Sequence, residues 1–171
     1  GADLCAIEEA EEFLESVPEK QPFMGTSCCP AWSVMAKTEF PGFEPYISMT
    51  MTPMVLTARL VKRRNPGCRI AFIGPCAAKK LEASRRSVRS EVDFVLTFEE
   101  LRGMFEAKDI DLEKVEDCPS HYEASAPGVG FAAGGGVAKA VEDVIHRLHP
   151  EVEVKTITAD GLRDRKSTRL N

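Results

Sequence analysis

The chain contains 171 residues, of which 43% are apolar and 29% are charged, and its formal net charge is -5. This composition is typical of a globular protein with one sizeable core, and the negative charge argues against nucleic acid as the main partner. No apolar run approaches the roughly 18 residues that a membrane-spanning helix needs, and the acidic N-terminal stretch differs from a signal peptide. We therefore expect a cytoplasmic protein without a membrane partner.

The first half of the chain predicts three helices. Helical spacing of apolar residues over residues 6–17 predicts a surface helix that ends before Pro18. The chain then passes through TSCCPAW, residues 26–32, into a short helix that stops near Phe40. A further helix follows over residues 52–64 and is closed by an Asn-Pro-Gly turn.

The next segments predict strands as well as helices. The apolar run CRIAFIG, residues 68–74, follows a turn and predicts a buried strand, with Cys76 just beyond its carboxyl end. Residues 92–109 predict a strand and then a helix, where Thr97 and Glu100 have the spacing of a capping box.

The last part of the chain continues this alternation. Residues 116–128 predict an irregular connection, residues 137–149 a helix, and residues 152–158 a strand. Alternating strands and helices indicate the α/β class, with a sheet flanked by helices and functional loops at the ends of strands.

A glycine-rich stretch over residues 128–141 invites comparison with a nucleotide-binding loop. Its spacing satisfies neither the dinucleotide fingerprint nor the P-loop, and no predicted strand precedes it. We expect close packing of backbone against a neighbouring element instead.

Six cysteines are spread along the chain: Cys5, Cys28, Cys29, Cys68, Cys76 and Cys118. A disulfide framework is a poor interpretation for a chain of this size that has no signal peptide. The remaining interpretations are reduced thiols that ligate a metal, take part in catalysis or simply pack as small apolar groups.

Two of these cysteines stand next to a proline. Cys29 lies in SCCP and Cys76 in GPCAAKK, where the neighbouring proline restricts the backbone and suits presentation of a thiolate to a metal. An inert, buried thiol is the competing interpretation, because no C-x-x-C spacing is present. Cys28 adjoins Cys29, and adjacent side chains point in different directions, so the pair rarely serves one purpose.

Lys79 and Lys80 follow Cys76 by three and four residues. If a helix begins near Ala77, one lysine returns toward the cysteine and offers its ammonium group to an anionic ligand. The simpler interpretation makes the basic stretch over residues 79–89 a solvated surface.

Glu9 and Glu12 lie three residues apart and hence on one face of the first predicted helix. Carboxyl groups that are partly buried, and whose pKa is raised, can relay protons. Exposed helix glutamates are far commoner, so this pair alone indicates little.

Together, TSCCPAW, GPCAAKKLEA, GADLCAIEEAEEF, VDFVLTFEELRGMF and GVGFAAGGGVAKAV resemble the catalytic domain of iron-only (FeFe) hydrogenases. The resemblance extends over residues 1–161. It implies an iron-only hydrogenase-like α/β fold and reversible reduction of protons to dihydrogen. It also implies a ferredoxin-like electron carrier and hydrogenase maturation proteins as partners.

The resemblance further implies a 4Fe-4S cluster held by four cysteines and bridged to a two-iron subsite with carbon monoxide, cyanide and dithiolate ligands. In the matching motifs, Cys29 and Cys76 would be two of the cluster ligands, and Lys79 would hydrogen-bond a cyanide. Reduced thiolates also agree with the compartment inferred from composition.

The same resemblance implies a route for protons. Cys28 would be no cluster ligand but would pass protons at the two-iron subsite. Glu9, Glu12 and Ser48 would continue the proton path from Cys28 to the surface. The two adjacent thiols would thus have separate roles.

Three departures from the family pattern shape the expectations. Gly74 stands where the second motif usually has a methionine, and a third motif with two more cluster cysteines in a C-x-x-x-C pattern is absent. Cys68 and Cys118 do not replace it, because neither has that spacing. Residues 162–171 look unlike the family continuation. We therefore expect a fragment that by itself has an incomplete cofactor and no activity.

Two alternatives remain open. Relatives of this fold bind iron-sulfur clusters without hydrogen chemistry, in cluster assembly or in hydrogen and redox sensing. Retention of Cys28 and Lys79 favours the enzyme, whereas Gly74 favours the non-catalytic role. An α/β domain with structural cysteines is the third interpretation.

Overall fold

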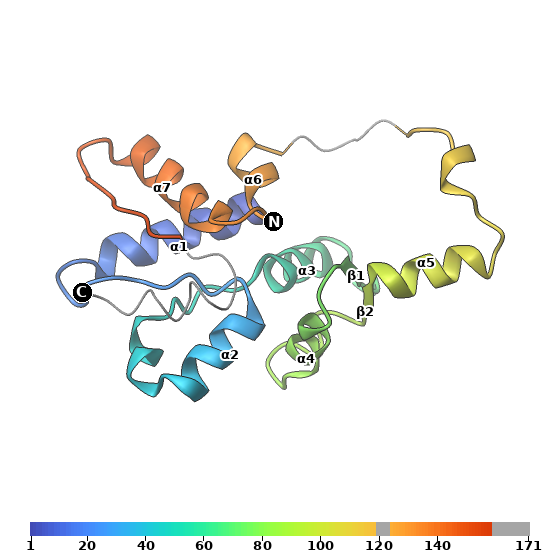
Figure 1. Cartoon of the computed structure of the whole chain (residues 1–171), viewed down its shortest axis with the longest axis horizontal. Coiled ribbons are helices and arrows are strands. Elements are labelled where there is room, and N and C mark those ends of the chain that lie inside the picture. Colours follow the sequence, from blue (N-terminus) through green and yellow to red (C-terminus); the bar gives the residue numbers. More distant parts are fainter. Residues whose placement is uncertain (119–123, 159–171) are drawn as a thin grey trace. The chain divides into compact units, whose positions relative to one another are not determined.

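The computed structural model describes residues 1–118 and 124–158 (Figure 1). The chain divides into two compact units: unit 1 comprises Gly1–Pro53 with Ala124–Asn171, and unit 2 comprises Met54–Glu123. Within the described ranges, no helix is long and apolar enough to cross a membrane.

Unit 1 is built on two packed helices, α1 (Ala2–Ser16) and α7 (Gly136–Leu148), with the short helix α6 (Ala126–Gly130) against both (Figure 1). The predicted helices over 6–17 and 137–149 are thus present, and α1 begins four residues earlier than expected. The buried residues of the two helices recur at helical spacing and are mostly small or β-branched: Cys5, Ala6 and Ala10 in α1, and Ala140, Val141, Val144 and Ile145 in α7.

The glycine-rich stretch provides a close backbone approach, as expected. Gly135 caps the start of α7 with φ of 71°, a left-handed conformation that glycine adopts without strain. A Cβ atom at Gly136 would overlap the carbonyl oxygen of Gly130. Glycine at these positions therefore lets the chain turn tightly from α6 into α7.

The rest of unit 1 carries the TSCCPAW segment. Helix α2 (Pro30–Glu39) matches the short helix expected before Phe40. The 3-10 helix η1 (Pro41–Tyr46) follows it and was not predicted. A parallel bridge pairs Gly25 with Ile47, with Gly25 N donating to Tyr46 O at 2.7 Å and Ser48 N to Gly25 O at 2.8 Å. This bridge sets the loop before Cys28 alongside the segment after η1.

Unit 2 contains helix α3 (Pro53–Arg64), strand β1 (Ala71–Gly74), helix α4 (Ala78–Ser84), strand β2 (Phe94–Thr97), helix α5 (Phe98–Glu106) and the 3-10 helix η2 (Leu112–Lys114). The two strands pair in parallel, from Ala71 opposite Phe94 to Gly74 opposite Thr97. Helix α4 lies in the connection between them, so the α/β class expected from the sequence is confirmed.

The capping box expected at the start of α5 is present. Thr97 N donates to Glu100 Oε2 at 2.8 Å, and Glu100 N donates to Thr97 Oγ1 at 3.2 Å. The reciprocal bonds satisfy two backbone donors that the first turn of a helix otherwise leaves without partners.

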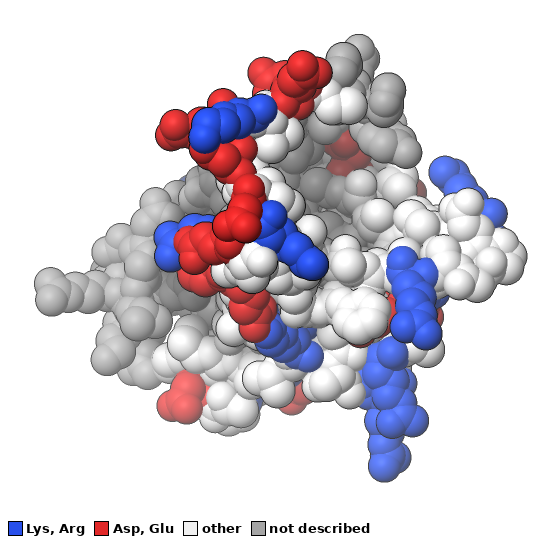
Figure 2. Space-filling view, turned by 90° about the vertical axis from the view of Figure 1, so that its right-hand side faces the viewer, with Lys and Arg blue, Asp and Glu red and all other residues white. Residues whose placement is uncertain are grey.

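Charges in unit 2 are segregated along the chain. Between residues 59 and 89 every charged residue except Glu82 is Lys or Arg, whereas most of the charged residues in 91–117 are Asp or Glu. Figure 2 shows acidic side chains interspersed with basic ones in one part of the view, and further Lys and Arg side chains on its right-hand side. Ion pairs join the two segments, including Arg59 Nε to Glu91 Oε1 at 3.2 Å.

Two strand predictions require correction. Strand β1 covers Ala71–Gly74, shorter than the expected 68–74, and it is not buried: Ile73 is 44% exposed and only Gly74 is buried. Within the described residues the sheet has just two strands.

Residues 152–158 were expected to form a strand, yet they form no strand pairing among the described residues. Their alternating pattern favours an extended backbone, but a strand also needs a partner for its hydrogen bonds. The irregular connection expected over 116–128 is also partly wrong, since α6 begins at Ala126. Residues 119–123 and the tail expected at 162–171 lie outside the described residues.

Candidate functional site

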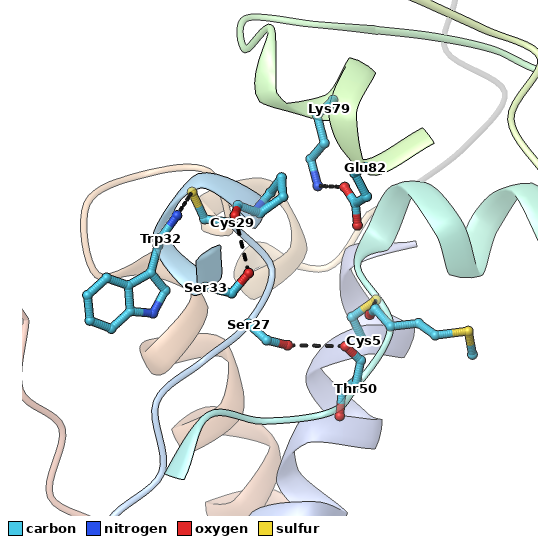
Figure 3. A network of polar contacts seen from close by, with 10 residues as sticks. Cys5, Ser27, Cys29, Trp32, Ser33, Thr50, Lys79 and Glu82 are labelled. Atoms are coloured by element: carbon cyan, nitrogen blue, oxygen red, sulfur yellow. Dashed lines mark hydrogen bonds and ion pairs between the residues drawn. The ribbon is translucent and has the colours of Figure 1, made fainter. Parts of the chain in front are cut away.

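Cys29 occupies the N-terminus of α2. It is the N-cap residue, Pro30 takes the first helical position, and the Cys29 Sγ accepts a hydrogen bond from Trp32 N at 3.5 Å (Figure 3). The Trp32 indole in turn donates to Thr26 O at 3.2 Å. Because proline has no N–H and a preset φ, it favours the helix start, and the half-buried sulfur is directed at that helix end.

Cys5 lies on α1, and the neighbouring groups include Cys28. The Cys5 thiol donates to Met51 O at 3.2 Å. Burial, followed by the charges of Glu8 and Glu9, raises the pKa of Cys5 to about 12, and Cys28 acts in the same direction. Cys5 is therefore a neutral thiol, and Cys28 lies near α1 while Cys29 caps α2.

Glu9 is one of the least exposed side chains of unit 1, with only 2% exposed. Its Oε1 accepts a hydrogen bond from Ser27 N at 3.0 Å. Burial raises the pKa of this carboxyl above its usual value, and hydrogen bonds from Ser27 and Ser48 offset that effect only in part. The charge of Glu12 acts in the same direction as burial. Glu9 thus holds a proton more readily than an exposed glutamate.

The pKa of Glu12, which lies one turn further along α1, is shifted in the opposite direction. Its Oε2 accepts from Ser48 Oγ at 2.6 Å and from Thr50 Oγ1 at 2.8 Å, and its Oε1 accepts from Met49 N at 2.9 Å. Burial alone raises the pKa of Glu12, but these hydrogen bonds outweigh burial and hold the pKa below its usual value. Glu12 is therefore an ionised acceptor at neutral pH.

Ser48 lies close to both carboxyl groups. It is 4% exposed, its hydroxyl donates to Glu12 Oε2 at 2.6 Å, and its proximity lowers the pKa of Glu9. Glu9, Ser48 and Glu12 thus form a largely buried row that starts beside the Cys28 loop. The sequence predicted these residues for one proton path, and the structure brings them together in unit 1.

The loop carrying Cys28 is fixed to the segment after η1 by a residue that sequence reasoning missed. Ser27 Oγ donates to Thr50 O at 3.1 Å, and Ser27 N contacts Glu9 as described (Figure 3). Thr50 was also missed, although it stands two residues after Ser48, on the same side of an extended backbone. That spacing was the available signal.

In unit 2, Cys76 follows β1 and is exposed. Lys79 lies on α4, which begins at Ala78, close to the expected start. Its Nζ forms an ion pair with Glu82 Oε2 at 2.8 Å, and the two side chains are 14% and 4% exposed (Figure 3). Glu82 was missed, although its spacing of three residues from Lys79 on a helix is a typical signal. The expected role of Lys79 toward an anionic ligand remains a prediction.

The described residues do not by themselves fit the four-cysteine cluster that the resemblance implies. Nowhere in residues 1–118 and 124–158 do three or more His, Cys, Asp or Glu side chains gather in a way that could hold a metal ion. Cys29 and Cys76 belong to different units, and Cys5 is committed as a buried, neutral thiol. A complete cluster therefore needs ligands other than those described.

Comparisons with known proteins give the family. A model described as "Iron only hydrogenase large subunit, C-terminal domain" matches residues 1–171. The chain is 31% identical over 156 residues to iron hydrogenase 1 of Clostridium pasteurianum, which covers 82% of this chain and 27% of that protein. It is 29% identical over 153 residues to the cytosolic Fe-S cluster assembly factor NAR1 of Kluyveromyces lactis, which covers 84% of this chain and 33% of that protein.

A comparison with a solved structure indicates the same family. The chain resembles a variant of apo [FeFe]-hydrogenase HydA1 from Chlamydomonas reinhardtii with a TM-score of 0.70 and 28% identity, over 95% of this chain and 46% of that one. The chain spans about a third or less of these two curated relatives and under half of the solved chain. The resemblance carried by the cysteine motifs and the hydrogenase-like α/β fold are both confirmed. The chain belongs to the family of iron-only hydrogenase large subunits and matches its C-terminal domain.

Proposed function

We propose that this chain is part of a catalytic domain that reversibly reduces protons to dihydrogen with electrons from a ferredoxin-like carrier. The observation that carries the proposal is the buried row of Glu9, Ser48 and Glu12, which begins beside the loop of Cys28. Each member can accept or donate a proton, and Ser48 donates a hydrogen bond to Glu12.

The energetic cost of burying the Glu9 carboxyl group supports a catalytic role. A carboxyl group that is 2% exposed and has no basic partner destabilises the folded state whenever it is ionised. A protein that only carries an iron-sulfur cluster needs cysteine thiolates and has no need of a buried acid. Proton transfer to and from a metal site gives such an acid a use.

The row also has a chemical polarity. Burial raises the pKa of Glu9 and hydrogen bonds lower the pKa of Glu12, so Glu9 holds a proton more readily than Glu12. Cys28 would exchange protons with the inner end at Glu9, and Glu12 would be the outer member. The chain itself thus supplies binding and movement of protons.

The metal chemistry would come from the cofactor implied by the family. Cys29 and Cys76 would supply two thiolates of a 4Fe-4S cluster, and Lys79 would face an anionic ligand of a two-iron subsite. The other ligands would come from residues outside those described. When bound, this group would pass on the electrons of the carrier and provide the metal centre at which dihydrogen forms. We also propose hydrogenase maturation proteins as partners and a cytoplasmic location.

A second function has its own support. The named relatives include a cytosolic Fe-S cluster assembly factor of comparable identity. In unit 2, the Cβ position of Gly74 is only 2.7 Å from the ring of Phe72, so the aromatic ring fills the space that a side chain at this position would take. A chain without the family's methionine there would suit a cluster protein that has no two-iron subsite.

Infrared spectroscopy of the full-length polypeptide separates the two functions. The protein is produced anaerobically with the hydrogenase maturation machinery, and the metal-bound carbon monoxide and cyanide bands are sought. We expect these bands together with hydrogen evolution, and we expect Cys28→Ala to keep the bands and lose nearly all turnover. Iron-sulfur absorption without such bands would instead support the assembly or sensing function.

A further inference from the structure

Thr50 contacts two members of the buried row. Its hydroxyl donates to Glu12 Oε2 at 2.8 Å, and its backbone N–H donates to Ser48 Oγ at 3.1 Å. Its carbonyl oxygen accepts the Ser27 hydroxyl at 3.1 Å (Figure 3). One residue therefore connects the loop of Cys28 with both Ser48 and Glu12.

These contacts restrict the Ser48 hydroxyl. A serine hydroxyl has one proton to donate and two lone pairs that accept. The N–H of Thr50 takes one lone pair, and the short 2.6 Å contact with Glu12 takes the proton. Ser48 is thus oriented to accept from Thr50 N and to donate to Glu12.

We propose that Thr50 is a positioning residue of the proton path, which holds the Ser48 hydroxyl and the Glu12 carboxylate in the arrangement in which Ser48 donates to Glu12. The proposal rests on the proposed function for its purpose, but the geometry on which it depends belongs to the chain itself. In the step, Ser48 gives its proton to Glu12, and the Ser48 oxygen takes a proton from the inner side of the path. Glu12 becomes neutral, and Ser48 is unchanged.

The surroundings of Glu12 explain its ionised resting state. Among the described residues, Glu12 has no ion pair, and the segment from Ser48 to Thr50 contains no titratable group. The titratable neighbour of Glu12 is Glu9, on the same helix. Cys5 in turn has Glu8, Glu9 and Cys28 as titratable neighbours. The ionised state of Glu12 therefore depends on neutral donors, of which Thr50 is one.

The side chain of Thr50 is the part that mutation can test. Any residue keeps the backbone N–H, but only a hydroxyl at this position donates to Glu12. Thr50→Val keeps the shape and removes that donor, whereas Thr50→Ser keeps the donor. Thr38→Val is a matched control, since Thr38 is exposed and its hydroxyl bonds only carbonyl groups of its own helix, those of Val34 and Met35.

The experiment is a pH titration of the whole chain labelled with 13C at the glutamate side-chain carboxyl carbons, followed by NMR. Glu12→Gln identifies the Glu12 signal. We expect Thr50→Val to move the Glu12 titration to higher pH, Thr50→Ser to restore it, and Thr38→Val to leave it unchanged. A Glu12 titration that is the same in Thr50→Val and the wild type would overturn the proposal.

A folding defect in Thr50→Val does not remove the test. Thr50→Ala makes the same deletion without a branched side chain, and its Glu12 titration is predicted to shift in the same direction. If the full-length protein evolves no hydrogen while Thr50→Val still shifts Glu12, the positioning role stands and the proposed enzyme function fails. If hydrogen is evolved but Thr50→Val leaves the Glu12 titration unchanged, only the positioning role fails.

Discussion

Ser48 donates its hydroxyl proton to Glu12 across 2.6 Å, although 36 positions separate the two residues in the chain. Ser48 comes from the segment after η1 and Glu12 from α1, so the contact forms only when unit 1 has folded. This contact helps to keep Glu12 ionised, and the chemistry proposed for the chain depends on it.

Glu9→Gln should raise stability and lower activity together. In the wild type the folded pKa of Glu9 is raised, so the protein loses stability as pH rises from the ordinary glutamate range through that folded pKa. Gln keeps an oxygen for Ser27 N and cannot ionise, and we expect a gain of about 1 kcal/mol near neutral pH. Urea unfolding at several pH values measures it.

The activity of the same variant completes the test. In the full-length protein, loss of a general acid–base should reduce hydrogen evolution by about 100-fold. A variant that is more stable yet fully active would remove Glu9 from the proton path. The exposed Glu11 on the same helix provides a control, because Glu11→Gln should change neither quantity.

Glu12→Gln should have the opposite effect on stability. The folded pKa of Glu12 is lowered by donors that outweigh burial, so its contribution is present above the unfolded pKa and is lost as pH falls through the folded pKa. We expect a loss of about 1–2 kcal/mol at neutral pH, which disappears in acid. Thermal unfolding followed by circular dichroism at pH 7 and in acid would reveal it, and an equal loss at both pH values would contradict the assignment.

Cys5 should resist alkylation while Cys76 reacts. Cys5 is 1% exposed and burial raises its pKa to about 12, whereas the Cys76 side chain is exposed. Because the thiolate is the reacting species, iodoacetamide at pH 8 should label Cys76 first and Cys5 only after unfolding in guanidinium. Peptide mass spectrometry of timed samples distinguishes them. Early labelling of Cys5 in the folded chain would contradict its burial.

Removing one member of the Lys79–Glu82 ion pair should lower the free energy of unfolding more than removing both members. The two side chains are 14% and 4% exposed, so Glu82→Leu leaves an ammonium group in a largely dry site, at a cost of about 2–4 kcal/mol. Adding Lys79→Met should recover much of that loss. Denaturant unfolding of the four proteins of this double-mutant cycle gives the coupling, and strictly additive losses would rule the pair out as a structural unit.

Reconstitution of the 171-residue chain with iron and sulfide should yield no complete 4Fe-4S cluster and no hydrogen evolution. The reason is that its described residues gather no group of three metal ligands. Ultraviolet–visible and electron paramagnetic resonance spectra would test this. A stoichiometric cluster in the isolated chain would show that Cys29 and Cys76 find further ligands within it.

Helix positions were largely predictable from local signals. The apolar spacing in α1 and α7, the Asn-Pro-Gly turn after α3 and the capping box at Thr97 all act within a few residues, so the sequence indicates them directly. The strands were less predictable. Residues 152–158 alternate as a strand does, but pairing depends on a partner that local sequence does not specify.

The candidate site divides in the same way. Sequence motifs by themselves determined the family, the two proline-flanked cysteines and the identity of Glu9, Glu12 and Ser48 as candidates, because motif residues are recognised without knowing their neighbours. Only the tertiary structure decided that Glu9 is buried and Glu12 is held by three donors, and it alone brought in Ser27 and Thr50. Burial and hydrogen bonding set a carboxyl's proton affinity, and both arise from segments that are distant in the chain and meet only on folding.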